Sequence, residues 1–151
     1  MKLKGTNIVI DTAWGDSGKG KFVDVFSGDA DLVVRFNGGA NAGHTVVNDY
    51  GEFKFHLIPT GIFNPDALSI LAGSVALSPL TLVDEINELR EKGVLISAKN
   101  LLISEYAHMI MPWHIARDNL RETARGDSKV GTTGRGIGPL YADRTERVGV
   151  R

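Results

Sequence analysis

The first segment that could do chemistry is a glycine-rich loop with charged side chains, Trp14-Gly15-Asp16-Ser17-Gly18-Lys19-Gly20-Lys21. Glycine amides and a lysine at the start of a helix are suited to surrounding a phosphate. The loop does not fit the Walker pattern G-x-x-x-x-G-K-[ST], because Ala13 stands at the upstream glycine and Gly20 replaces the magnesium-binding hydroxyl residue. A generic P-loop kinase or NTPase is therefore disfavoured. Asp16 instead adds a carboxylate that can reach a substrate and a metal together.

Two further glycine-rich segments carry groups suited to catalysis and anion binding. They read Val34-Arg35-Phe36-Asn37-Gly38-Gly39-Ala40-Asn41-Ala42-Gly43-His44-Thr45 and Gly131-Thr132-Thr133-Gly134-Arg135-Gly136-Ile137-Gly138-Pro139-Leu140-Tyr141-Ala142-Asp143. His44 titrates near neutrality and can donate a proton to a developing oxyanion. The hydroxyls of Thr132 and Thr133, with Arg135, suit a nucleotide monophosphate. Each segment alone also fits an ordinary turn, and a lone histidine is more often a core residue, so only the three together favour a site.

Short apolar runs alternate with helical patterns along the chain. Strands are predicted at 7–10, 31–36, 53–57, 68–72 and 101–103, and helices at 19–26, 79–92 and 113–125. This order predicts an α/β fold with a mainly parallel central sheet and helices on its faces. The first loop then lies between a strand and a helix, in a P-loop-like arrangement, and the second follows a strand directly. Residues 131–151 show little periodicity and are expected to be mostly loop.

The helix at 79–92 has the clearest signals. Ser78 is a good N-cap, Pro79 takes the first helical position and Gly93 is a natural stop. The apolar stripe is expected at Leu82, Val83, Ile86 and Leu89. The polar side chains expected to face mainly water are Asp84, Glu85, Asn87 and Glu88.

Composition narrows the classes of protein that remain. The 151 residues suit one compact domain, and the net charge of -1 gives no indication of binding to nucleic acid or an anionic membrane. No signal-peptide core and no run of about 18 apolar residues occurs. The absence of cysteine excludes disulfides and thiolate metal sites and agrees with a cytoplasmic location. Arg144, Arg147 and Arg151 form one local basic cluster, and Arg144 and Arg151, taken singly, are interpreted as solvated surface.

The three loops together resemble the motifs of the adenylosuccinate synthetase family. The family patterns are W-G-D-x-G-K-G-K, V-R-x-x-G-G-x-N-A-G-H-T and G-T-T-G-R-G-I-G-P-x-Y, and they occur here in that order. The intervening segments 56–62, 77–79 and 114–125 are also similar to the family. The resemblance covers essentially all of residues 1–151, which we expect to be the amino-terminal part of a single, longer ligase domain.

The resemblance implies GTP-dependent ligation of L-aspartate to inosine monophosphate (IMP), which is the first committed step from IMP to AMP. The purine 6-oxygen attacks the γ-phosphate of GTP, and the aspartate amine then displaces phosphate from the 6-phosphoryl intermediate. By motif position, Asp16 is expected to be the general base and a Mg²⁺ ligand, and His44 the acid that assists departure of GDP. Lys19 is expected to stabilise charge on the transferring phosphoryl group, since this chemistry depends mostly on positioning and charge neutralisation.

The resemblance also implies binding roles. The carbonyl of Gly43 is expected to be a further magnesium ligand, and Asn41 and Thr133 resemble IMP contacts. Arg135 falls in a substrate loop, and Arg147 corresponds to an arginine that crosses a homodimer interface to the partner subunit's nucleotide. The remaining expected nucleotide- and substrate-binding positions are Gly15, Ser17, Gly18, Gly20, Lys21, Ala42, Thr45 and Thr132.

The chain departs from the family patterns at a few positions. Ser17 replaces the usual glutamate, Ala13 and Asn37 stand where glutamines are common, and Ala40 stands where histidine is frequent. Substrate affinity or purine preference could therefore differ. Phage relatives that use dGMP lack the general-base carboxylate, so the presence of Asp16 favours IMP over a different purine monophosphate.

Two family features are missing from these residues. The guanine-recognition pattern T/N-K-x-D does not occur, and the later arginine-bearing loop for aspartate is absent. We therefore expect little ligase activity from residues 1–151 alone. The alternative is a non-catalytic nucleotide- or phosphate-binding module.

Overall fold

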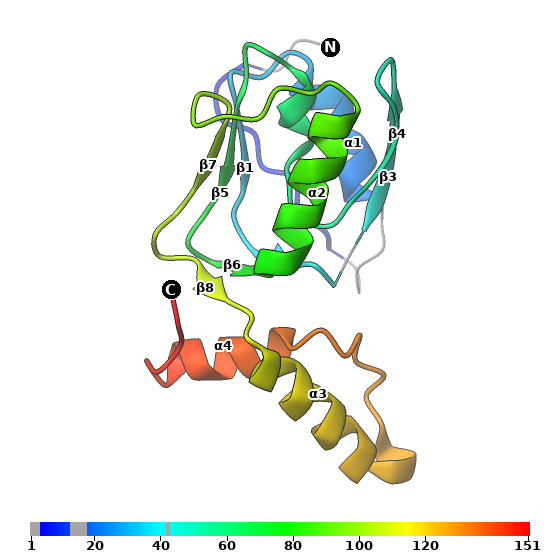
Figure 1. The fold of residues 1–151 in the computed structure, drawn as a ribbon, viewed down its shortest axis with the longest axis vertical. Helices are drawn as coiled ribbons and strands as arrows, with labels where there is room; N and C mark the ends of the chain where they lie inside the picture. The colour runs from blue at the N-terminus through cyan, green and yellow to red at the C-terminus, as the bar shows by residue number, and fades with distance from the viewer. Residues whose placement is uncertain (1–3, 13–17, 42) are drawn as a thin grey trace.

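A parallel arrangement of three chain segments forms the centre of the computed structural model, which describes residues 4–12, 18–41 and 43–151 (Figure 1). The first sheet has the order β1-β5-β7 and contains β1 (Leu32–Arg35), β5 (Leu68–Leu71) and β7 (Leu101–Ile103). The second has the order β2-β6-β8 and contains β2 (Gly38–Gly39), β6 (Val75–Leu77) and β8 (His108–Met109). All neighbouring strands in both sheets are parallel. The same three segments thus continue from one sheet into the other in the same order, which confirms the predicted α/β class.

Helices and a hairpin complete this part of the molecule. They are α1 (Lys19–Ser27), the antiparallel hairpin of β3 (His44–Asn48) and β4 (Gly51–Phe55), the 3-10 helix η1 (Thr60–Phe63) and α2 (Pro79–Glu91). In the view of Figure 1, α2 runs between the parallel strands and the hairpin. The alternation predicted around residues 53–57 is confirmed, because Phe53 and Phe55 are buried while Lys54 is exposed. The largest fully buried side chains of this core are Phe53, Phe55, Leu57, Ile58, Leu71 and Leu89.

Helix α2 begins and ends close to its predicted bounds, but its buried face differs from the prediction. The Ser78 side chain accepts a hydrogen bond from the amide of Thr81, as an N-cap should. Glu85 is only 4% exposed, whereas Val83 is 53% exposed. Residues 82, 85, 86 and 89 are three or four apart and share a face, so Glu85 is buried with the leucines and Val83 falls outside the stripe.

The predicted strand at 7–10 is wrong. These residues form no strand, and Ile8 and Ile10 are 70% and 66% exposed. A groove of about 430 Å³ separates the segment from β1, with Val9 and Val33 among the residues that line it. A strand requires ladder hydrogen bonds, and the apolar run has no paired neighbour among the described residues.

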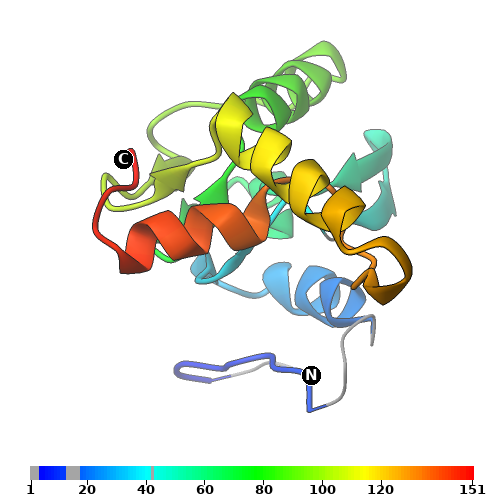
Figure 2. The same ribbon diagram turned by 90° about the horizontal axis from the view of Figure 1, so that it is seen from below.

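The last part of the chain extends below the sheets as a helical unit. It contains α3 (Pro112–Ala124), the 3-10 helix η2 (Gly126–Ser128) and α4 (Ile137–Thr145), and α4 packs against α3 (Figure 2). Helix α3 confirms the predicted helix at 113–125. Helix α4 contradicts the expectation that residues 131–151 are mostly loop. Its inner face is short, with Leu140 packed against Ala76 and Ile110, so no apolar repeat marked it in the sequence.

None of the helices in the described part of the chain is both long and apolar enough to cross a bilayer.

Candidate functional site

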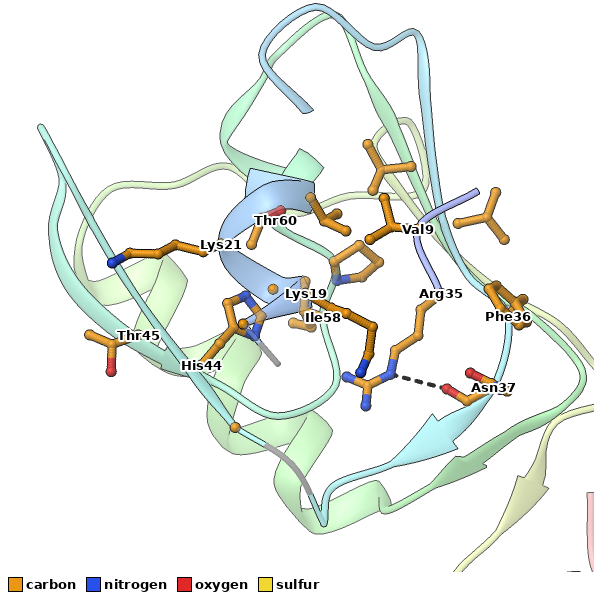
Figure 3. Close-up of a pocket in the computed structure, with 17 residues that line it drawn as sticks. Val9, Lys19, Lys21, Arg35, Phe36, Asn37, His44, Thr45, Ile58 and Thr60 are labelled. Atoms are coloured by element: carbon orange, nitrogen blue, oxygen red, sulfur yellow. Dashed lines mark hydrogen bonds between the residues drawn. The ribbon is translucent and has the colours of Figure 1, made fainter. Parts of the chain in front are cut away.

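A pocket of about 470 Å³ opens where the start of α1, the end of β1 and the start of β3 meet (Figure 3). The buried residues Ile58, Pro59 and Thr60 form part of its wall. Its charged and polar lining residues are Lys19, Lys21, Arg35, Asn37, His44, Thr45 and Thr60. The first and second glycine loops, separated by a helix and a strand in the sequence, therefore contribute to one cavity.

The two loops touch at Gly20 and His44. A Cβ atom on Gly20 would lie 2.7 Å from Cγ of the His44 ring, which is closer than two such atoms approach. Only glycine allows the first turn of α1 to pack directly on this histidine. The contact fixes His44 beside the N-terminus of α1, which is the end of a helix that binds phosphate.

His44 is half-buried, and one of its ring nitrogens has no hydrogen-bond partner among the described residues. Its Nε2 atom is inaccessible to water and has no hydrogen-bond partner among the described residues, and the same is true of Thr60 Oγ1 in the pocket wall. Burial lowers the pKa of His44, and the positive charge of Arg35 lowers it further, whereas Asp24 raises it. The imidazole is therefore neutral at pH 7. A phosphate ligand would add the negative charge that favours the protonated form.

Lys19, the first residue of α1, extends into the same pocket and lies 2.8 Å from the Asp11 carboxylate, between Nζ and Oδ2. The lysine side chain is 40% exposed and the aspartate 12%. Figure 3 shows Lys19 and Arg35 projecting into the space that His44 borders. The cavity thus gathers cationic side chains around an apolar floor, as an anionic ligand requires.

Arg35 holds the main chain around the pocket. Its Nη2 atom donates to the carbonyl of Gly39 at 2.7 Å, and its Nη1 atom donates to the carbonyls of His56 and Leu57, the latter at 3.3 Å. Burial lowers the pKa of this guanidinium, an effect that the negative charge of Glu85 opposes. The sequence placed Arg35 in the second motif but gave it no role.

The third glycine loop is held by acidic side chains of α3. Glu122 accepts hydrogen bonds from the amides of Val130 at 2.5 Å, Gly131 at 3.2 Å and Thr132 at 3.3 Å. Asp118 accepts the amide of Gly136 at 2.9 Å. A Cβ atom on Gly136 would lie 2.9 Å from the His114 backbone, and its φ is +75°, so this position requires glycine.

A buried network joins α3 to α4 beside this loop. His114 Nδ1 accepts the amide of Met111, so its Nε2 carries the hydrogen that bonds to Asp143 Oδ2 at 3.0 Å. Arg117 donates to the other carboxylate oxygen at 2.5 Å. The hydrogen bond from Arg117 lowers the pKa of Asp143, burial opposes this, and the bond to His114 lowers it again. No motif in the sequence marked this pairing.

Comparisons with known proteins agree with this architecture. A model of the adenylosuccinate synthetase family matches residues 8–151. The chain belongs to the adenylosuccinate synthetase family. It is 50% identical over 147 residues to the adenylosuccinate synthetase of Halothermothrix orenii, and 51% identical over 146 residues to that of Acetivibrio thermocellus. Each alignment covers 97% of this chain but 34% of the relative, so the chain spans about a third of the length of the curated relatives it matches.

Solved structures show the same fold. Fully ligated adenylosuccinate synthetase from Plasmodium falciparum matches with a TM-score of 0.79 and 36% identity, covering 91% of this chain and 32% of that chain. The succinoaminodeoxyadenylate synthetase of cyanophage S-2L, bound to dGMP and dATP, matches with a TM-score of 0.66 and 20% identity, covering 88% and 36%. At that identity the phage protein supports the fold alone.

The structure brings together only some of the residues that the family motifs single out. Those that line the pocket are Gly18, Lys19, Gly20, Lys21, Gly43, His44 and Thr45. Asn41, Thr132, Thr133, Arg135 and Arg147 do not line it, although Arg135 reaches the second loop through a hydrogen bond to the carbonyl of Ala40. Arg147 is exposed after α4, with a φ of 63°. Gly15, Asp16, Ser17 and Ala42 lie outside the described residues.

Oxygen ligands for a magnesium ion are sparse in the described part of the chain. No group of three or more histidine or acidic side chains there could hold a metal. Gly43, whose carbonyl is an expected ligand, is exposed and lies beside His44 at the pocket. This fits Mg²⁺, which keeps several waters and commonly binds one or two protein oxygens together with substrate phosphates.

Proposed function

We propose that the enzyme to which these residues contribute joins L-aspartate to IMP, converting GTP to GDP and phosphate. The observation that supports this most is the contact between the first and second glycine loops, which puts Lys19 and His44 in one cavity with an unpartnered ring nitrogen. Family membership and the order of the three motifs support the same reaction. In this proposal, residues 1–151 are the amino-terminal part of a single, longer catalytic domain.

The described side chains would act mainly by positioning and charge. Lys19 would neutralise the phosphoryl group as it moves from GTP to the 6-oxygen of IMP. His44, neutral in the pocket, would donate a hydrogen bond through Nε2 and pass its proton as negative charge develops on departing GDP. Asp16, the proposed base for the purine N1 proton, supplies the carboxylate on which the choice of IMP over dGMP rests.

Bound Mg²⁺ would supply charge neutralisation for the phosphates. Its protein ligands in this proposal are Asp16 and the carbonyl of Gly43. Asn41, Thr132, Thr133 and Arg135 would hold the IMP nucleotide, with Arg147 supplied from the partner subunit of a homodimer. A cytoplasmic location belongs to the same proposal, on the basis of the family and the cysteine-free composition.

The test is an assay of the complete protein with IMP, GTP, aspartate and magnesium, followed by the ultraviolet absorbance change on adenylosuccinate formation. A signal that needs all four components is expected. Replacing IMP with dGMP tests the alternative purine, and turnover with dGMP alone would overturn the assignment of IMP. Tight nucleotide binding without any turnover by a folded sample would support the non-catalytic module instead.

A further inference from the structure

We propose that Glu85 is a positioning residue for the pocket, acting through the main chain of residues 56–58; this inference rests on the proposed ligase function. Glu85 lies on α2 and does not line the pocket itself. Its carboxylate binds the segment that leads into the pocket wall. It thereby fixes Gly43 and His44 without touching a substrate.

The hydrogen bonds of Glu85 are directed at three successive amides. Oε1 accepts the amide of His56 at 2.5 Å and that of Leu57 at 3.0 Å, and Oε2 accepts the amide of Ile58 at 2.9 Å. Leu57 and Ile58 are fully buried, so no water is available to replace the carboxylate. A charged acidic side chain is buried at this depth only where such partners hold it.

Arg35 binds the same segment through its carbonyls. It donates to the carbonyl oxygens of His56 and Leu57 while also holding the carbonyl of Gly39 in the second glycine loop. The negative charge of Glu85 favours the charged guanidinium. Anionic Glu85 on α2 therefore accepts from the amides of residues 56–58, while cationic Arg35 at the end of β1 donates to the carbonyls of residues 56 and 57. Together they fix this segment from both sides.

This stretch contacts the residues proposed to handle the phosphoryl group. The Nδ1 atom of His56 lies 3.5 Å from Glu85 Oε1. Its Nε2 atom would lie 3.1 Å from a Cβ placed on Gly43, so the ring packs directly under that residue. On the other side, Ile58 lines the pocket itself. Removing the Glu85 charge would therefore shift the support of the second loop.

The experiment compares Glu85→Gln with Glu88→Gln in the complete enzyme. Glu88 lies on the same helix and pairs with Lys92 at 2.7 Å, near the surface, so its variant controls for loss of a charge from α2. We expect E85Q to lower kcat by about 10- to 100-fold, as loss of an outer-shell partner commonly does, and E88Q to keep wild-type kcat. The KM for aspartate should stay near wild type in both, because that substrate is expected to bind beyond these residues.

Hydrogen exchange supplies a readout that does not depend on turnover. Amides of 56–58 and 43–45 should exchange faster in E85Q than in E88Q. A folded E85Q with the kcat and exchange rates of E88Q would overturn the inference while leaving the ligase function in place. Inactive wild-type enzyme would overturn the proposed function, and this inference with it.

His56→Gln keeps the inference testable if E85Q does not fold. Its side chain is 31% exposed, and the substitution leaves the three amide bonds to Glu85 intact. Because the ring under Gly43 is lost, kcat should fall as in E85Q while the melting temperature stays close to wild type. Wild-type kcat in folded H56Q would overturn the inference, because the support of Gly43 by residues 56–58 would then have no effect on turnover.

Discussion

The second and third glycine loops are held by side chains of opposite charge. In the second, the Arg35 guanidinium binds carbonyl oxygens, including that of Gly39. In the third, Glu122 and Asp118 bind amides. Both sets of side chains satisfy main-chain hydrogen-bonding groups of the glycine-rich segments.

Arg35 and Glu122 also differ in how exposed to water their surroundings are. Arg35 acts on segments that pass through the core beside the fully buried Leu57, and its charge is balanced by buried Glu85. Glu122 lies on the outer part of α3, and the loop amides that it binds belong to exposed residues. The second loop is thus a fixed part of the core. In the third loop only the bond from Gly136 to Asp118 is buried, whereas the bonds from residues 130–132 to Glu122 are exposed.

The largest effect is expected from Arg35→Gln. The substitution removes the cation whose charge interacts with buried Glu85, and it removes the donors to four carbonyls, those of Asn37, Gly39, His56 and Leu57. The free energy of unfolding should fall by about 3–5 kcal/mol, because several partly buried carbonyls lose a charged donor. Urea unfolding of the complete protein measures this, with exposed Arg90→Gln on α2 as the control. Equal stability of the two variants would show that the second loop does not depend on its cation.

Gly136→Ala tests the fixed end of the third loop. The new Cβ would meet the backbone of His114, and the residue would keep a φ of +75°. Gly131 has nearly the same φ, +76°, but open space around it. We expect Gly131→Ala to lose about 1–2 kcal/mol from left-handed strain alone, and G136A to lose more. Identical melting temperatures for the two variants would contradict the packing of Gly136 on α3.

Asp143→Asn tests the charge network that joins α4 to α3 beside this loop. Arg117 lowers the pKa of Asp143 in the folded chain, so the carboxylate stabilises the fold fully above its ordinary pKa of 3.8. This stabilisation is lost as the pH falls through the lowered pKa. The stability difference between wild type and D143N should therefore be constant near neutral pH and shrink in acid. Exposed Asp84→Asn should show no comparable difference, and a gap independent of pH would argue against an ionised Asp143.

The smallest effect on stability is expected from Glu122→Gln. Burial disfavours the charged form of Glu122, but hydrogen bonds from the amides of the third loop outweigh this and lower its pKa. Glutamine keeps one acceptor oxygen but carries no charge, so the loop amides are held less tightly and repulsion toward a phosphate is removed. The KM for IMP should fall relative to wild type, with exposed Glu91→Gln as the control. A rise in KM would mean that Glu122 braces the loop for the nucleotide instead of competing with it.

Local signals in the sequence predicted most of the regular structure. Ser78 and Pro79 set the start of α2, and the alternation at Phe53 and Phe55 identified β4, because capping and periodic burial depend on near neighbours. The α/β class followed from the alternation of such elements. Lys19 and His44 belong to short contiguous motifs and line one pocket, while their catalytic roles stay a prediction.

Contacts between distant segments determined the rest. The 7–10 run reads as a strand, but no described strand pairs with it. Helix α4 was not predicted, because its packing depends on contacts of Leu140 with the distant residues Ala76 and Ile110. The local sequence predicts that Glu85 faces water. It is buried instead, because the fold places the amides of residues 56–58 against its carboxylate.

The sequence by itself thus determined the family, the order of most elements and the three glycine-rich motifs, since each depends on contiguous residues. Only the tertiary structure decided that Gly20 packs on His44, and that Arg35 and Glu85 hold one segment between them. The reason is physical: a buried charge or a close backbone approach depends on partners far away in the chain, and no local pattern specifies them.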